Sequence, residues 1–301
     1  MTIAELHGKI SGTGKNVHDR LEDLLTSDVF GSILYSEKWE ILEEWLSLAS
    51  NAFEESLKDV FQLHQIESVT IVFWPSGGRF GREPDVLLKI VTSDNESYGF
   101  CVEAKFLSGK SNAGPMIEQE SEDKEDREVS PETPPGDQLA DQWLQIQKQS
   151  IPNYEWDDVS VENRALIFIT AHQAVPHTAF EETFSALSKQ QRDTEKVRKK
   201  CFWLGWSCLH QVLAEHCEDR KDEPLSGSDL IIQHLYELLE RKGLRHFRGY
   251  ARCVEGIKEL DLELNLAGPI FWNNRFFSFL EDAPQVQSEE YVFWRQQNEG
   301  K

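Results

Sequence analysis

The spacing of apolar residues changes abruptly after residue 63, from a helical to a β-strand pattern. Upstream, apolar side chains recur at three- and four-residue steps, which is the spacing of an amphipathic helix. Downstream, three short β-rich runs are separated by turn-forming residues. The sequence predicts a helix or helical pair over 16–35 broken at Gly31, a second helix over 36–63, and three antiparallel strands at 67–74, 85–91 and 98–106.

The rest of the chain alternates helices and strands after a long polar segment. Between 107 and 136 aliphatic residues are almost absent and Glu, Asp, Ser and Pro are frequent, which predicts a disordered acidic loop. Asp137 is a favourable N-cap for the next helix. Further patterns predict strands at 164–170 and 201–206 and helices over 177–199, 209–217 and 228–242. We therefore expect an α/β core domain over 1–222 and a C-terminal α+β extension over 223–301, packed on that core.

Composition limits the location and the partners of the protein. Aromatic residues make up 11% of the 301 residues, as in a folded chain. No apolar run approaches the roughly 18 residues of a membrane span and no signal peptide is visible, so we expect a cytoplasmic protein without a membrane partner. Five widely spaced cysteines without a CxxC pair agree with a reducing compartment. The net charge of −22 predicts weak attraction to polyanions, which any nucleic-acid function must overcome.

The residues most suggestive of chemistry lie at the ends of the second and third predicted strands. Pro84-Asp85 opens one strand, and Glu103-Ala104-Lys105 ends the next. Side chains alternate along a strand, so Glu103 and Lys105 share a face that Asp85 can reach from the neighbouring strand. Two carboxylates, with the Ala104 carbonyl as a further ligand, suit Mg²⁺ or Mn²⁺. A lysine beside the metal can hold the attacking water and neutralise charge on a phosphate, which predicts phosphodiester hydrolysis.

This arrangement resembles the PD-(D/E)xK, or restriction-endonuclease-like, nuclease superfamily. The motif of that family corresponds to Pro84-Asp85 and Glu103-Ala104-Lys105, and its core order of helix, three strands, helix, strand matches the order predicted over 16–170. The resemblance implies a Mg²⁺-dependent DNA nuclease in which Asp85, Glu103 and Lys105 are catalytic. It also implies an acidic residue on the first helix, at Glu22, and a glutamine after the lysine strand, at Gln138, as in RecB-like members. The segment 22–31 is similar to proteins of bacterial anti-phage defence loci, which implies an antiviral role.

Each of these residues also has an ordinary structural interpretation. Glu103 and Lys105 can form a surface salt bridge, and Asp85 can cap a turn. Glu22 can be a solvated helix residue, and the adjacent Asp23 is a competing candidate. In RecB-like proteins a tyrosine usually follows the glutamine, whereas here Trp143 stands later than that tyrosine would.

Basic residues are scarce, so their positions suggest where a substrate binds. Arg79 and Arg82 precede Pro84 in a glycine-containing loop and can clamp a phosphate. Arg245 and Arg248 lie in a basic, aromatic segment suited to phosphate contact, although such residues can also be plain surface at a helix end. The predicted partner is DNA, with RNA not excluded, together with a protein that delivers or licenses DNA. The alternative function is a noncatalytic protein-interaction subunit built on a nuclease fold.

Overall fold

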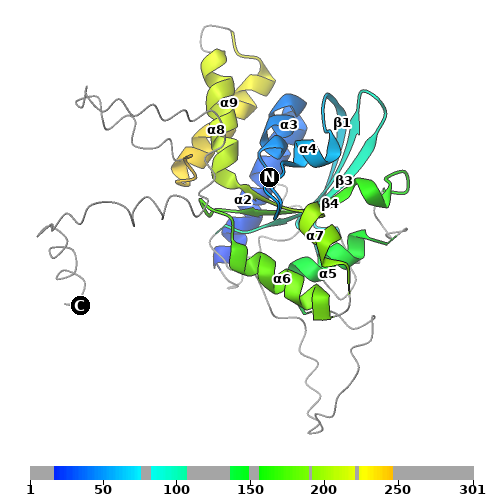
Figure 1. Ribbon diagram of the computed structural model, residues 1–301. Helices are drawn as coiled ribbons and strands as arrows, with labels where there is room; N and C mark the ends of the chain where they lie inside the picture. The colour runs from blue at the N-terminus through cyan, green and yellow to red at the C-terminus, as the bar shows by residue number, and fades with distance from the viewer. Residues whose placement is uncertain are drawn as a thin grey trace, which may run out of the picture. The chain divides into compact units, whose positions relative to one another are not determined.

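The computed structural model describes residues 17–75, 83–106, 136–148, 156–189, 192–220 and 224–246, with the backbone only for 17–20. All of these residues belong to one compact unit that spans Met1–Lys258. Within them the fold is mixed α/β, and five strands form one mixed sheet in the order β1-β2-β3-β4-β5 (Figure 1). The strands are β1 Ile66–Phe73, β2 Val86–Thr92, β3 Ser97–Ala104, β4 Arg164–Thr170 and β5 Cys201–Gly205.

The strand directions bring the ends of several strands to one edge of the sheet. The pairs β1–β2 and β2–β3 are antiparallel, as expected from the short turns between the predicted strands. The pairs β3–β4 and β4–β5 are parallel. The carboxyl ends of β3, β4 and β5 therefore share an edge with the amino end of β2. Val86 pairs with Val102, which places the residue before β2 beside the end of β3.

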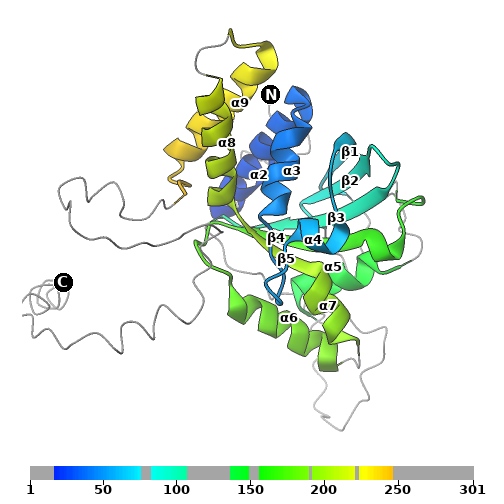
Figure 2. The same cartoon turned by 45° about the horizontal axis from the view of Figure 1, so that its top comes forward.

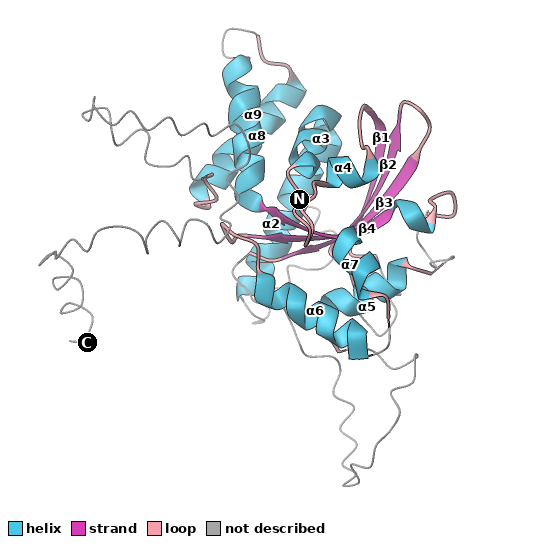
Figure 3. Cartoon of the chain, in the orientation of Figure 1, coloured by secondary structure: helices cyan, strands magenta, loops and turns pink. Residues whose placement is uncertain are grey.

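Helices cover both faces of this sheet, as Figures 2 and 3 show. One face packs in the larger hydrophobic core against α2 Val17–Ser36, α3 Trp39–Ser47, α4 Leu57–Phe61, α8 Trp206–Asp219 and α9 Gly227–Arg241. The other face packs in a second core against α5 Gln138–Ile146, α6 His177–Lys189 and α7 Thr194–Lys200.

The central strands are apolar on both sides because both faces are covered. In β2, Val86 and Leu88 belong to the larger core whereas Leu87 belongs to the second core. All seven residues of β4 are buried. Continuous apolar runs of this kind are expected in strands that lie between two helical layers.

The structure corrects three of the predicted helices. The helix expected over 36–63 ends at Ser47 and restarts as α4 at Leu57. Between them, the Asn51 side chain accepts hydrogen bonds from the backbone N–H groups of Phe53 and Glu55, an arrangement that competes with helical hydrogen bonding. Conversely, α2 continues through Gly31, where a break was expected.

The helix expected over 177–199 is also divided, into α6 and α7. Asp193 caps the start of α7 by accepting hydrogen bonds from the N–H groups of Glu195 and Lys196. A 3₁₀ turn, η2 Val161–Asn163, precedes β4. The other elements predicted within the described ranges are present, and their ends differ from the prediction by at most a few residues.

Several predicted features lie partly or wholly outside the described residues. The acidic loop predicted over 107–136 is outside them except for Gly136. Of the extension predicted over 223–301, the described part contains α9, which packs against α2 and α8 in the larger core. None of the described helices is long and apolar enough to cross a membrane.

Candidate active site

Asp85, Glu103 and Lys105 meet at the edge where β2 begins and β3 ends. The Oδ2 atom of Asp85 accepts a hydrogen bond of 2.8 Å from the backbone N–H of Ala104. The Nζ atom of Lys105 lies 2.6 Å from Oε1 of Glu103. Glu103 is 1% exposed and Lys105 is 9% exposed. The surface salt bridge considered for Glu103 and Lys105 is therefore replaced by a buried ion pair.

Glu22 joins this group from α2. Its Oε1 atom accepts a hydrogen bond of 2.9 Å from Nζ of Lys105, and its Oε2 atom accepts one of 3.0 Å from the backbone N–H of Phe106. Glu22 is itself buried. Lys105 is thus held between two carboxylates, one from its own strand and one from a helix more than eighty residues earlier.

Two glutamines of α5 hold the Glu103 carboxylate from the other face of the sheet. The Nε2 atom of Gln138 donates to Oε1 over 2.6 Å, and the Nε2 atom of Gln142 donates to Oε2 over 2.5 Å. Gln138 is a predicted site residue, whereas Gln142 is not among the residues that the sequence predicts for the site. The signal for Gln142 is its spacing, because residues four apart lie on the same face of a helix.

Backbone and capping contacts fix the elements that carry the site. The Oδ1 atom of Asp137 accepts hydrogen bonds from the N–H of Ala140 and from the Thr183 hydroxyl, both over 2.9 Å, which attaches the start of α5 to α6. The indole N–H of Trp206 donates to the carbonyl of Lys105 over 3.1 Å. The lysine backbone is therefore held from the α8 side while its side chain points into the cluster.

The cluster contains more acidic than basic groups. Burial raises the pKa of Asp85 well above its usual range, and the nearby Glu103 carboxylate raises it further. Burial alone lowers the pKa of Lys105, but the surrounding carboxylates of Glu103, Asp85 and Glu22 outweigh that effect and raise it above its ordinary value. Lys105 is therefore charged at neutral pH, and three acidic side chains surround this one positive charge.

The donor set fits a hard divalent cation. Mg²⁺ in proteins is commonly bound by one or two carboxylates and retains several waters. Asp85 and Glu103 supply two carboxylates, and among the described residues Oδ1 of Asp85 accepts no hydrogen bond. The Ala104 backbone lies against the Asp85 carboxylate, as its N–H contact shows. No group of three or more His, Cys, Asp or Glu side chains is arranged as a metal site in the described part of the chain, so the pair must act with backbone or water ligands.

The predicted substrate-binding arginines are not gathered at the cluster by the described residues. Arg79, Arg82 and Arg248 lie outside the described ranges. The Arg245 side chain is 65% exposed, and its Nε atom lies 3.4 Å from Oε1 of Glu240. Their role in substrate binding stays a prediction.

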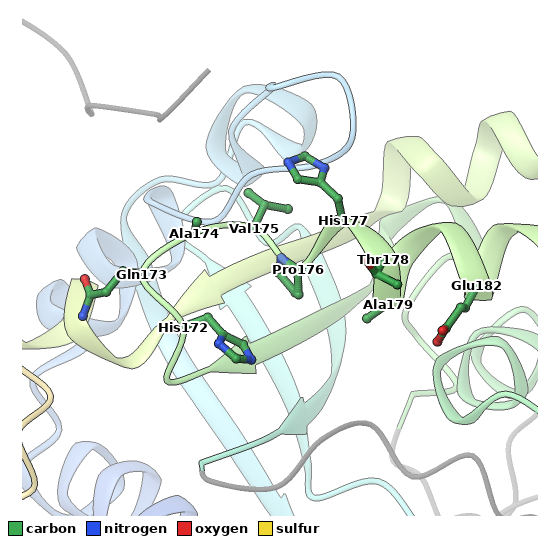
Figure 4. Close-up of a pocket in the computed structure, with 9 residues that line it drawn as sticks. All are labelled: His172, Gln173, Ala174, Val175, Pro176, His177, Thr178, Ala179 and Glu182. Atoms are coloured by element: carbon green, nitrogen blue, oxygen red, sulfur yellow. The ribbon is translucent and has the colours of Figure 1, made fainter. Parts of the chain in front are cut away.

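A separate open pocket follows the end of β4 (Figure 4). The Oγ1 atom of Thr170 accepts hydrogen bonds from the N–H of His172, over 3.3 Å, and from the indole N–H of Trp203, over 2.9 Å, which attaches the pocket loop to the sheet. The pocket has a volume of about 740 Å³, and none of its lining residues belongs to the carboxylate cluster. Its lining consists of His172, Gln173, Ala174, Val175, Pro176, His177, Thr178, Ala179 and Glu182.

Comparisons with protein-family models, with curated proteins and with solved structures find no match for this chain. The chemistry of the cluster must therefore be inferred from its own residues. These are Glu22, Asp85, Glu103, Lys105, Gln138 and Gln142, which come from α2, from the residue before β2, from the end of β3 and from α5.

Proposed function

We propose that the protein is a divalent-metal-dependent nuclease that hydrolyses DNA phosphodiester bonds, with the carboxylate cluster as its active site. One observation carries the proposal. Residues that the PD-(D/E)xK resemblance implies, spread from Glu22 to Gln138, are joined by direct hydrogen bonds and ion pairs around Lys105 and Glu103. The order of α2, β1 to β3, α5 and β4 also agrees with the order implied for a restriction-endonuclease-like core.

In this proposal each side chain has a distinct task. Asp85 and Glu103 would hold Mg²⁺ or Mn²⁺, which supplies Lewis-acid stabilisation of charge on the scissile phosphate. Lys105 orients the attacking water by hydrogen bonding and places a fixed positive charge where the phosphate becomes more negative. Glu22 orients Lys105, and the amides of Gln138 and Gln142 orient the carboxylate of Glu103.

The burial of the cluster supports a functional rather than a stabilising role. Removing charged groups from water is costly, and buried ion pairs often contribute little net stability. A buried group with strongly shifted pKa values and a surplus of carboxylates is the arrangement found at many active sites. Because three acidic groups surround one lysine here, stability alone gives no reason for this composition.

The net charge of the chain affects how DNA reaches the site. At −22 the protein as a whole repels a polyanion. We therefore include in the proposal a protein partner that delivers or licenses the DNA. The antiviral setting implied by the resemblance is compatible with such a partner and is tested by phage infection of cells that carry the wild-type or the inactive gene.

The direct test is a cleavage assay on the purified full chain. Circular DNA, linear DNA and RNA are each incubated with Mg²⁺, with Mn²⁺ and with a chelator, and Asp85→Asn serves as the matched inactive variant. We expect metal-dependent cleavage of DNA by the wild type and none by the variant. Cleavage of RNA alone would reassign the substrate, and equal activity of both proteins would reassign the active site.

A noncatalytic interaction subunit is the second candidate, favoured by the strongly acidic composition. Metal binding separates the two functions, because an interaction module has no need of Mg²⁺ at this edge. We would measure metal binding by calorimetric titration of Mg²⁺ and Mn²⁺ into the wild type and into an Asp85→Ala/Glu103→Ala double variant. Binding that the double variant loses supports the nuclease, and its absence in the wild type supports the interaction subunit.

A further inference from the structure

Helix α9 ends in a motif that fixes the position of Lys242. Gly243 has a φ of +73°, a left-handed conformation that glycine adopts without strain. Its N–H donates to the carbonyl of Glu240, and the N–H of Leu244 donates to that of Leu239, both over 3.0 Å. This is the hydrogen-bond pattern of a Schellman motif. Leu244 is buried, so the C-cap residue Lys242 extends from a backbone that is anchored in the core.

The Lys242 side chain lies against the residue that follows Lys105. Its Nζ atom is 5.4 Å from the centre of the Phe106 ring, within the range of a cation–π interaction. The backbone N–H of Phe106 donates to Glu22, over 3.0 Å, so this ring directly adjoins the carboxylate cluster. Both Lys242 and Phe106 are half-buried. A second ammonium group therefore lies beside the proposed active site and remains accessible to solvent.

The Lys242 side chain has no carboxylate in direct contact among the described residues. Within the described ranges it forms no ion pair shorter than 4.0 Å. Its charge acts at longer range on Asp28, whose pKa is raised by burial and lowered by Lys242. Arg245, which is predicted from the sequence to bind phosphate, has its Nε atom 3.4 Å from Oε1 of Glu240. The contacts favour Lys242 over Arg245 as the member of this basic segment that serves the site.

We propose that Lys242, supported by the Phe106 ring, is a binding subsite for a backbone phosphate adjacent to the phosphate that is cleaved. This inference rests on the proposed nuclease function and specifies where the substrate backbone runs, from Lys105 toward the end of α9. An ammonium group is a compact charge suited to a phosphate oxygen. The chain has a net charge of −22, so the Lys242 ammonium group, which has no ion-pair partner in the described part of the chain and lies at the edge of an acidic cluster, can attract a polyanion to the site.

The competing role for Lys242 is to balance the charge of the half-buried Asp28 on α2. The two roles predict different behaviour of variants. If Lys242 only balances Asp28, the Asp28→Asn/Lys242→Ala double variant binds DNA as well as its parent. If Lys242 contacts phosphate, the double variant binds as weakly as Lys242→Ala alone.

The experiment measures DNA affinity against salt concentration. The parent is the full chain carrying Asp85→Asn, which binds without cleaving, and the probe is a fluorescent DNA duplex in Mg²⁺ with NaCl between about 50 and 200 mM. Each lost phosphate contact reduces the slope of log K against log salt by about 0.9 on duplex DNA. We expect Lys242→Ala to lose about 0.9 of slope and Lys242→Arg to retain the parent slope. Phe106→Leu keeps the charge and is expected to weaken binding at an unchanged slope.

The matched control is Lys89→Ala, which removes one positive charge from the middle of β2. Lys89 is four residues beyond Asp85 along the chain and lies 2.7 Å from Asp158. We expect it to retain the parent slope. Three results would overturn the subsite while leaving the nuclease proposal intact. They are an unchanged salt slope in Lys242→Ala, an equal loss of slope in Lys89→Ala, and DNA binding by the Asp28→Asn/Lys242→Ala variant as strong as that of the parent. A parent that binds neither DNA nor RNA overturns the proposed function and the subsite with it.

Discussion

Lys105 is held by two carboxylates of different origin, which gives it both a fixed position and a fixed charge. Glu103 lies two residues earlier on the same strand, and Glu22 approaches from α2. Their combined effect raises the pKa of Lys105 in spite of its burial. The ammonium group therefore acts as a permanent charge and hydrogen-bond donor rather than as a proton acceptor at neutral pH.

Replacing Lys105 by alanine is expected to reduce cleavage and stability together. Loss of one preorganised donor at a developing negative charge lowers a rate by about 10²–10³-fold. Breaking a buried ion pair by removing one partner costs about 3–5 kcal/mol, because Glu103 and Glu22 are left without their counter-charge. Single-turnover cleavage and denaturant unfolding measure the two effects.

The Lys89→Ala change is the control for Lys105→Ala, because Lys89 is only partly buried and its partner Asp158 is exposed. Its ion pair with Asp158 is at the surface, so we expect its stability to stay within about 0.5 kcal/mol of the wild type. Full cleavage activity in Lys105→Ala would contradict the active-site proposal. Full stability would contradict the buried ion pair itself.

Gln142→Leu is expected to weaken metal binding without removing a metal ligand. The change leaves Oε2 of Glu103 without its donor, and an unsatisfied buried acceptor costs about 1–3 kcal/mol. Residues that orient a ligand typically contribute about 10–100-fold to metal affinity. Calorimetry with Mn²⁺ and thermal unfolding test this, with Gln211→Leu as control because Gln211 forms a similar but exposed contact with Glu215. Equal Mn²⁺ affinity in both variants would show that Gln142 has no positioning role.

At this scale the sequence predicts strand residues better than helix residues. Alternation along β3 places Glu103 and Lys105 together, and the structure has their side chains in contact. The choice between Glu22 and Asp23 could not be made, because both are acidic and the helix pattern of α2 does not show which side faces β3. Gln142 was missed because its partner, Glu103, is 39 positions away in the sequence.

Among the elements, predictions fail where distant contacts override a local pattern. The strand at 164–170 is observed with those bounds because its apolar run is short and buried on both faces. The continuous helix expected over 36–63 is not observed because the segment after Ser47 forms contacts with a distant part of the chain. The Asn51 side chain donates to the carbonyl of Lys199, and the backbone of Ser50 pairs with that of Trp203. The local sequence pattern cannot predict hydrogen-bond partners that are about 150 residues away.

The start of α9 depends on Asp229, and this dependence predicts how stability changes with pH. Asp229 completes a capping box with Ser226 and lies 3.1 Å from both Lys38 and Arg220. Hydrogen bonds from Ser226 and the nearby Lys38 lower the pKa of Asp229 well below its usual value. The stabilisation that ionised Asp229 gives the folded state is therefore fully present above the pKa of Asp229 in the unfolded chain, about 3.9. It is lost as the pH falls from there through the lower pKa of Asp229 in the folded state.

Asp229→Asn is accordingly expected to destabilise the protein by about 1–2 kcal/mol at neutral pH, with a difference from wild type that shrinks below about pH 4. Urea unfolding from pH 7 to pH 3 measures this difference. Asp59→Asn on α4 is a suitable control, since Asp59 caps with Ser56 but lies in an exposed position. A difference that stays constant across this pH range would contradict the role given to the Asp229 charge.

For the molecule as a whole, the excess of negative charge is both global and local. The chain has 53 acidic and 31 basic residues, and the cluster repeats this imbalance inside the fold with three carboxylates around one lysine. The global charge can be read from the sequence, but the local surplus cannot, because it requires α2, the start of β2 and the end of β3 to meet. The fold thus brings several acidic side chains together at one edge of the sheet, and a cation bound there would reduce the repulsion between them.

Binding of Mg²⁺ is therefore expected to stabilise the entire described unit against unfolding. A ligand that binds only the folded state at 100 times its dissociation constant adds about 2.7 kcal/mol. For a domain of this size class that corresponds to a rise in Tm on the order of 5–10 °C. Thermal unfolding with increasing Mg²⁺ measures the rise, and equimolar changes in NaCl control for ionic strength. We expect Asp85→Asn/Glu103→Gln to lose the Mg²⁺ effect, because it removes both carboxylates while retaining their shapes. A rise of equal size in that double variant would place the cation elsewhere on this acidic protein, and the cluster would then be a structural ion-pair network rather than a metal site.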